Sequence, residues 1–223
     1  MHKIYTQKRI EKTIADLSEW MAHLEAAYGI PRAYLQAVLF KEMSDADLLD
    51  CLADFAVKCY WLQFDVLSFF RRVLKMPPLR HFPGGLLNKR DSSTGYAQIF
   101  GYVAIRAIRF SLAHGLDGDL ASFGLTAGHP LDENIPSDLC MVWRRLNRDA
   151  SFNLRLAALN LIAAAEEMTG RMDFSSYSPE EIQLIFTRYN ANTRSITPYG
   201  REVYQYYLSF RQPSPSARQT KAS

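Results

Sequence analysis

The chain has 223 residues, of which 48% are hydrophobic, and its net charge is +3. A chain of this length and apolar content can build a sizeable core, which excludes disorder throughout and suits one domain of ordinary to large size. The charge is mild, and there is no dense Lys/Arg run and no alternation of basic and aromatic residues. The sequence therefore argues against nucleic-acid binding.

The three cysteines, Cys51, Cys59 and Cys140, form no CxxC pair, and the histidines show no metal-ligand spacing. The sequence therefore predicts neither a metal site nor a cofactor. We expect free, buried thiols, as is usual in proteins that fold in a reducing compartment. No apolar run is long enough to span a membrane, and the N-terminal residues lack the apolar segment of a secretory signal.

Apolar residues three or four positions apart predict a first helix over residues 8–28. Gly29 is its expected C-terminal stop. Pro31 suits the first turn of a second helix, which ends near Met43.

The next predicted helix is the longest, over residues 45–75, with Ser44 as its expected N-cap. Trp61 and Phe64 lie within it, and apolar residues cover much of its circumference. We therefore expect this helix at the centre of the core.

Further helical patterns fill the second half of the chain, so the predicted fold class is mainly α with few or no strands. Ser178 and Glu181 have the spacing of a capping box, which predicts a helix that ends near Tyr189. The other predicted helices cover residues 95–114, 138–148, 151–169 and 198–211.

Glu42 lies at the end of an apolar helical stripe. Leu35, Val38 and Leu39 precede it at positions that share one helical face. A carboxylate in this setting is desolvated, which favours the protonated form that can donate a proton. The alternative is a solvent-facing Glu at a helix end, paired loosely with Lys41.

The segment from Asp91 to Gln98 is rich in turn-forming and hydrogen-bonding residues. Gly95 allows the chain to pass close to another group, and Gln98 offers one acceptor and two donors to a sugar. Alternatively, Ser92 or Ser93 caps the following helix and Gln98 lies on the surface. Asp91 also has two interpretations, a helix cap or a group that orients a water molecule.

Tyr189 and Asn190 supply another polar pair at a helix end. A Tyr hydroxyl can hydrogen-bond a nearby carboxyl and bias its protonation, whereas Asn190 could be no more than a helix C-cap. Tyr96, Tyr102 and Tyr199 could stack on sugar faces or belong to the core.

Taken in order, these segments resemble the lysozyme-like superfamily, most closely the soluble lytic transglycosylase and goose-type lysozyme group, glycoside hydrolase family 23. That family places its acid at the end of a helix, before Ser, as in residues 37–44 with Glu42. Its Gly-Leu-Met-Gln-Ile motif is similar to Gly-Tyr-Ala-Gln-Ile at 95–99. Its Ala-Tyr-Asn-x-Gly motif, followed by a Tyr-rich segment, is similar to residues 188–192 and 203–207.

The sequence departs from the family pattern at two points. Glu42 and Gln98 are farther apart than usual because the long apolar helix lies between them, which implies an inserted core helix. Asn192 stands where the family usually has Gly. The implied domains are an N-terminal helical segment over 1–30 packed on the main domain, a lysozyme-like catalytic domain over 31–211 and a disordered tail over 212–223.

The resemblance implies a glycosidase that cleaves peptidoglycan between N-acetylmuramic acid and N-acetylglucosamine, with Glu42 as general acid and then base. A lytic transglycosylase of this family needs no second carboxylate. A hydrolase needs one to hold the attacking water, for which Asp91 is the candidate and Asp45 the reserve. The residues expected to bind glycan or to set the proton state of Glu42 are Ser93, Gly95, Tyr96, Gln98, Tyr189 and Asn190.

The implied substrate lies outside the cytoplasm, whereas the N-terminus predicts synthesis in the bacterial cytoplasm without a Sec signal. We therefore expect action in the periplasm or cell wall after export by a secretion system, a phage holin or an exported partner. An antibacterial effector of this kind would be accompanied by an immunity protein. The alternative function is a non-catalytic helical module that binds glycan or protein on a lysozyme-like scaffold.

Overall fold

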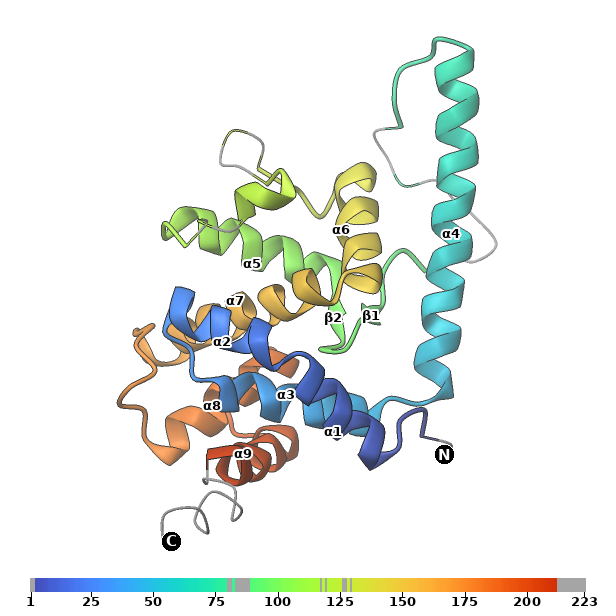
Figure 1. The fold of residues 1–223 in the computed structure, drawn as a ribbon. Coiled ribbons are helices and arrows are strands. Elements are labelled where there is room, and N and C mark those ends of the chain that lie inside the picture. Colours follow the sequence, from blue (N-terminus) through green and yellow to red (C-terminus); the bar gives the residue numbers. More distant parts are fainter. Residues whose placement is uncertain are drawn as a thin grey trace, which may run out of the picture. The chain divides into compact units, whose positions relative to one another are not determined.

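The computed structural model describes residues 3–79, 82, 89–116, 118, 120–125, 128 and 130–211, and the tail expected over 212–223 lies outside them. The described chain is mainly helical with a two-stranded sheet, which confirms the predicted class (Figure 1). Within these ranges no helix combines the length and apolar character needed to cross a bilayer. The chain divides into two compact units, unit 1 (Met1–Thr6 with Asp45–Asn160) and unit 2 (Gln7–Ser44 with Leu161–Ser223).

Unit 1 combines a short hairpin with several helices. Strands β1 (Ser93–Thr94) and β2 (Ile99–Phe100) pair antiparallel, with Thr94 opposite Ile99. An isolated bridge between Lys3 and Asp47 ties the N-terminal residues to the start of the longest helix. The helices of unit 1 are α4 (Leu48–Val73), α5 (Gly101–Ala113), the 3-10 helix η1 (Leu120–Phe123), α6 (Pro136–Arg148) and the first half of α7 (Ala150–Thr169).

The structure corrects two predicted helix starts in unit 1. Asp47, not Ser44, is the N-cap of α4, because its carboxyl accepts hydrogen bonds from the backbone amides of Leu49 (2.8 Å) and Asp50 (3.3 Å). The helix expected from residue 95 begins only at Gly101, since the residues before it form the hairpin. Strands of two residues are too short to leave a periodic pattern.

The prediction that the longest helix lies at the centre of the core is wrong. One face of α4 is buried, but the opposite face is open, and Phe55 and Leu62 are each 63% exposed. Apolar residues around the whole circumference therefore do not imply burial around the whole circumference. The buried apolar residues of α4 are Val57, Tyr60, Trp61 and Phe64.

The cysteines are free, as predicted, but their burial differs. Cys140 is buried, whereas Cys59 is half-buried and Cys51 is exposed. The prediction of buried thiols is therefore wrong for Cys51, which lies in the first turn of the half-open helix α4.

The described part of unit 2 consists of helices joined by loops. The helix expected over 8–28 is interrupted at Leu17, whereas Gly29 ends the second piece as predicted, with a left-handed φ of 70°. Ser178 and Glu181 form the predicted capping box. The helices are α1 (Gln7–Asp16), α2 (Ser18–Tyr28), α3 (Arg32–Asp45), the second half of α7, α8 (Pro179–Asn190) and α9 (Pro198–Arg211).

An aromatic cluster around Tyr34 joins three helices of unit 2. The ring centroid of Tyr34, on α3, lies 5.4 Å from that of Phe186 on α8 and 4.7 Å from that of Tyr207 on α9. Phe174 packs edge-on against the same ring at 4.9 Å. Burial raises the pKa of Tyr34, so its hydroxyl stays protonated in this cluster.

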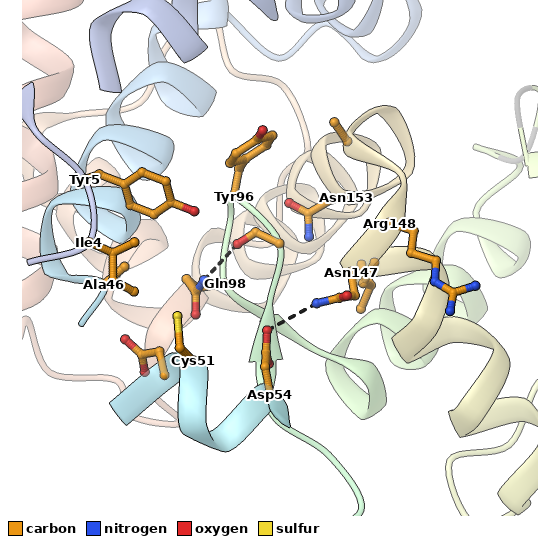
Figure 2. Close-up of a pocket in the computed structure, with 14 residues that line it drawn as sticks. Ile4, Tyr5, Ala46, Cys51, Asp54, Tyr96, Gln98, Asn147, Arg148 and Asn153 are labelled. Atoms are coloured by element: carbon orange, nitrogen blue, oxygen red, sulfur yellow. Dashed lines mark hydrogen bonds between the residues drawn. The ribbon is translucent and has the colours of Figure 1, made fainter. Parts of the chain in front are cut away.

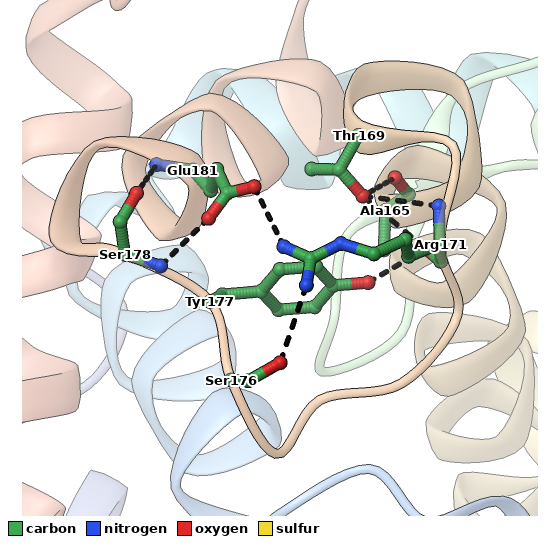
Figure 3. A network of polar contacts seen from close by, with 7 residues as sticks. All are labelled: Ala165, Thr169, Arg171, Ser176, Tyr177, Ser178 and Glu181. Atoms are coloured by element: carbon green, nitrogen blue, oxygen red, sulfur yellow. Dashed lines mark hydrogen bonds and ion pairs between the residues drawn. The ribbon is translucent and has the colours of Figure 1, made fainter.

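A polar network fixes the loop between α7 and α8 (Figure 3). The Arg171 guanidinium donates hydrogen bonds to Glu181 (2.7 Å) and Ser176 (3.2 Å) and lies over the Tyr177 ring. The Tyr177 hydroxyl donates to the Arg171 carbonyl oxygen at 2.6 Å. Because Glu181 also belongs to the capping box, the network sets where α8 begins.

Candidate functional site

Glu42 lies near the C-terminal end of α3 in unit 2. The apolar stripe predicted before it is confirmed, since Leu35, Val38 and Leu39 are fully buried, while Glu42 is half-buried. The Tyr199 hydroxyl, from the first turn of α9, donates a hydrogen bond to Glu42 Oε1. The carboxyl group is thus held on a rigid helix and shielded in part from water.

Tyr189, near the end of α8, is a second phenol beside Glu42. Burial, and then the negative charge of Glu42, raise the pKa of Tyr189 well above its ordinary value. Tyr189 therefore keeps its proton next to the carboxyl group. The neighbouring Asn190 is the last residue of α8 and is exposed.

Lys41 adds a positive charge to this region of unit 2. It is only 9% exposed and forms an ion pair with Glu202 of α9. Its Nζ lies 5.9 Å from the centroid of the Tyr199 ring. Tyr199 therefore interacts with a carboxyl group through its hydroxyl and with an ammonium group through its ring face.

The hairpin of unit 1 carries the second predicted set of residues. Gly95 has a φ of +74°, and a Cβ at this position would lie 2.2 Å from Asn153 Nδ2 and 2.7 Å from the Leu146 carbonyl oxygen. The Asn153 side chain donates to the Thr94 carbonyl oxygen (3.0 Å) and accepts from the Ala97 amide (2.9 Å). The expected close approach at Gly95 is confirmed, and Asn153 is the group that approaches.

Gln98 closes the hairpin turn in a strained conformation. Its φ of 45° is uncommon for a residue with a side chain. Its Nε2 donates a hydrogen bond to the Gly95 carbonyl oxygen at 2.8 Å. The side chain of Gln98 therefore closes the turn that its own backbone conformation makes.

A pocket of about 300 Å³ opens beside this hairpin within unit 1 (Figure 2). The predicted residues Gly95, Tyr96 and Gln98 line it, whereas Ser93 pairs with Phe100 in the sheet and is not a lining residue. The remaining polar lining residues are Tyr5, Asp50, Asp54, Asn147, Arg148 and Asn153.

Asp54 is a pocket residue that was not predicted from the sequence. Its carboxyl group accepts hydrogen bonds from Ser92 (2.6 Å), Thr94 (2.8 Å) and Asn147 (3.2 Å). Asn147 also donates to the Thr94 hydroxyl at 2.7 Å. In the structure the Asp54 carboxyl group joins α4, β1 and α6, whereas in the sequence it is one of several charged residues of α4 and carries no signal of its own.

Asp91 serves as a cap for α5. Its Oδ1 accepts from the backbone amides of Ser92 and Gly101, and its Oδ2 accepts from Tyr102, each at 2.9 Å. Gly101 and Tyr102 are the first two residues of α5, where a carboxylate is favoured by the helix dipole. Of the two roles considered for Asp91, the structure therefore supports the cap.

Asp91 should also make stability depend on pH. Burial raises its pKa to about 6 from the ordinary 3.8, although the three amide hydrogen bonds act in the opposite direction. The folded protein then binds the proton more tightly than the unfolded chain does. The contribution to stability is therefore complete below about pH 4 and lost as the pH rises through about 6.

We expect urea unfolding of the wild type and of Asp91→Asn to show this dependence. From about pH 4 to pH 7, the unfolding free energy of the wild type should fall relative to that of the variant by up to ~3 kcal/mol. If the unfolding free energies of the wild type and the variant instead changed with pH by the same amount, the amide hydrogen bonds would be keeping this carboxyl near its ordinary pKa.

The structure brings the predicted residues together in two sets. Glu42 and Tyr189 lie in unit 2, where Tyr199 also donates a hydrogen bond to Glu42, whereas the three hairpin residues line the pocket of unit 1. Asp45, the reserve carboxylate, is exposed at the last position of α3. Among the residues that the structure describes, no group of three or more His, Cys, Asp or Glu side chains could hold a metal ion.

Comparison of the chain with protein-family models, with curated proteins and with solved structures finds no match. The likeness to lysozyme-like enzymes therefore consists of the short motifs alone, and the functional argument depends on the geometry of the two sets of residues.

Proposed function

We propose that this protein cleaves the glycan strands of peptidoglycan, with Glu42 as the general acid and base. The position of Glu42 carries the proposal: it is a half-buried carboxyl at the end of a buried apolar face, flanked by Tyr199 and Tyr189. A general acid must be fixed in orientation and partly shielded from water, so that it holds a proton until the leaving oxygen needs it.

In the proposed reaction, Glu42 protonates the oxygen between N-acetylmuramic acid and N-acetylglucosamine as the glycosidic bond breaks. The Glu42 carboxylate then accepts the proton of the muramic 6-hydroxyl, whose oxygen bonds to C1 and gives a 1,6-anhydro product. We favour this transglycosylase route over hydrolysis because Asp91, the candidate for holding a water molecule, caps α5 with both oxygens. The hydroxyl groups of Tyr199 and Tyr189 would orient the carboxyl group in both steps.

The pocket of unit 1 supports a binding role for the hairpin. Sugar hydroxyl and acetamido groups need hydrogen-bond donors and acceptors, and sugar faces stack on aromatic rings. Gln98, Asn147 and Asn153 supply amides to the pocket, and Tyr96 supplies a ring. We infer that this pocket holds part of the peptidoglycan.

Digestion of purified sacculi, followed by mass spectrometry of the soluble products, tests the proposal. We expect muropeptides with 1,6-anhydro ends. Products with reducing ends would keep the glycosidase assignment and replace the transglycosylase route by hydrolysis. The absence of both products would contradict the proposed activity.

Tyr199→Phe should lower kcat/KM on sacculi about 10- to 100-fold, because a hydrogen bond to a charged group contributes about 1.5–3 kcal/mol. The matched control is Tyr206→Phe, which removes a hydroxyl from the same helix, where the Tyr206 ring packs on Phe40 at 4.6 Å. The control should keep the wild-type rate. An equal loss in both variants would attribute the effect to folding of α9 rather than to Glu42.

A non-catalytic binding module is the second candidate, and the polar pocket of unit 1 favours it. Retention of the protein on sacculi without soluble products, unchanged by Glu42→Gln, would support this function.

We further propose that the protein acts in the periplasm as an exported antibacterial effector that is neutralised by an immunity protein. Expression with and without a periplasmic signal tests this. Lysis only with the signal supports the proposal, whereas equal toxicity from the cytoplasm points to another target.

A further inference from the structure

Helix α4 of unit 1 carries a continuous exposed apolar seam. The exposed apolar residues of this seam follow one another at intervals of four and three positions in turn, which is the heptad pattern of a coiled coil. The heptad a positions are Leu52, Cys59, Val66 and Val73. The d positions are Leu48, Phe55, Leu62 and Phe69. Cys59 is half-buried, and the other seven side chains are 47% to 63% exposed. We call these eight residues the α4 seam.

The α4 seam is separate from the face of α4 that packs within unit 1. Val57 and Phe64 occupy heptad f positions, which lie on the opposite side of a helix, and both are buried. α4 therefore has two apolar faces, and its own unit uses one of them. The seam runs the full 26 residues of α4, about 39 Å, which is long enough for a stable pairing of two helices.

We propose that the α4 seam pairs with the α4 seam of a second copy of this chain as an antiparallel coiled coil. In antiparallel pairs, a positions face d positions. In one register every a residue of the seam faces a d residue of the partner seam. Leu52 faces Phe69 of the partner subunit, and Cys59 faces Leu62 of the partner subunit. The other layers repeat this match, with Val66 opposite Phe55 of the partner subunit and Val73 opposite Leu48 of the partner subunit. The twofold axis of this register lies at the midpoint of α4, so the two helices overlap completely.

The charges beside the α4 seam fit this register. The g positions Lys58 and Asp65 face each other in antiparallel pairs, so Lys58 meets Asp65 of the partner subunit on both sides of the axis. The e positions place Leu49 opposite Phe70 of the partner subunit, and these two side chains are 67% and 56% exposed in the single chain. A parallel pair would instead set Lys58 against Gln63 of the partner subunit and bring no opposite charges together.

The existing ion pair of Asp65 is compatible with this contact. Arg144 of the same chain donates to Asp65 at 2.5 Å and 3.2 Å, and the Asp65 side chain is still 47% exposed. A carboxylate can accept several hydrogen bonds, so it can bind Arg144 and Lys58 of the partner subunit together.

Sedimentation equilibrium of the full chain tests the pairing. The wild type should have twice the mass of one chain. Leu62→Glu should weaken the dimer about 100-fold or more, because it places carboxylates in a desolvated seam next to the axis. Leu67→Glu is the matched control, since Leu67 is exposed on the same helix at a b position outside the seam, and this variant should remain dimeric.

Cysteine cross-linking tests the orientation. In a chain whose Cys51 is replaced by Ser, mild oxidation should give no Cys59–Cys59 disulfide. Adding Leu62→Cys should give a covalent dimer in which peptide mapping joins position 62 to Cys59 of the partner subunit. A Cys59–Cys59 link in the first chain would overturn the antiparallel arrangement.

Three further results would overturn the proposal. One is a monomeric mass at all concentrations. Another is a dimer that Leu62→Glu leaves unchanged. The third is a monomer that cosediments with phosphatidylethanolamine–phosphatidylglycerol vesicles through the seam, which would assign it to a membrane surface. Circular dichroism and urea unfolding of each variant would show that the chain remains folded.

Discussion

Glu42→Gln should abolish the release of muropeptides from purified sacculi while leaving the protein folded. The amide keeps the shape of the side chain, and its carbonyl oxygen can still accept the hydrogen bond from Tyr199. It cannot donate a proton to the leaving oxygen or accept one from the muramic hydroxyl. Because both steps use the same group, we expect the rate to fall about 1,000-fold or more.

Glu167→Gln is the control for this prediction. Glu167 is an exposed carboxylate of unit 2 that pairs with Arg188, and its replacement should leave both the rate and the products unchanged. Thermal unfolding of the two variants would verify equal folding. Full activity of Glu42→Gln would exclude Glu42 as the acid, whatever the products of the wild type.

Gly95→Ala should lower the free energy of unfolding by about 3 kcal/mol or more. The new methyl group would force a left-handed φ of +74° on a residue with a side chain, which costs about 1–2 kcal/mol. It would also lie 2.2 Å from Asn153 Nδ2, so Asn153 must move away from its buried partners Thr94 and Ala97. Chemical denaturation of the purified variant measures the total.

Gly124→Ala separates the two causes. Gly124 also belongs to unit 1 and has a φ of +72°, but a Cβ there would meet nothing within 4 Å. This variant should show only the cost of the backbone conformation, and the difference between the two variants should measure the collision with Asn153. Equal losses would mean that Asn153 does not pack against Gly95 in solution.

Local sequence rules predicted the parts of the fold that depend on neighbouring residues. The stop at Gly29 and the capping box from Ser178 to Glu181 follow from turn chemistry and are confirmed. The exposure of α4 could not be predicted in the same way. Periodicity shows which positions are apolar, but it does not show whether a second surface covers them, and on α4 the pattern merges a buried face with an exposed seam.

The candidate site was predictable to the same limited extent. The stripe that ends at Glu42 is local to one helix and is confirmed, but Tyr199 lies 157 positions away and was considered only for stacking or the core. Asp54 was missed because its partners Ser92 and Asn147 lie 38 and 93 positions away. Contacts over such distances depend on tertiary packing, which short motifs do not encode.

The chain passes between the two units after Thr6, Ser44 and Asn160, so neither unit is a continuous stretch of sequence. During synthesis the helices of unit 1 follow one another directly, whereas α3 must wait for α8 and α9, which come much later in the chain. The carboxyl group of Glu42 therefore meets Tyr199, 157 positions farther on, only after α9 has been made. A nascent chain that stops short of α9 lacks the hydroxyl group that holds this carboxyl in place.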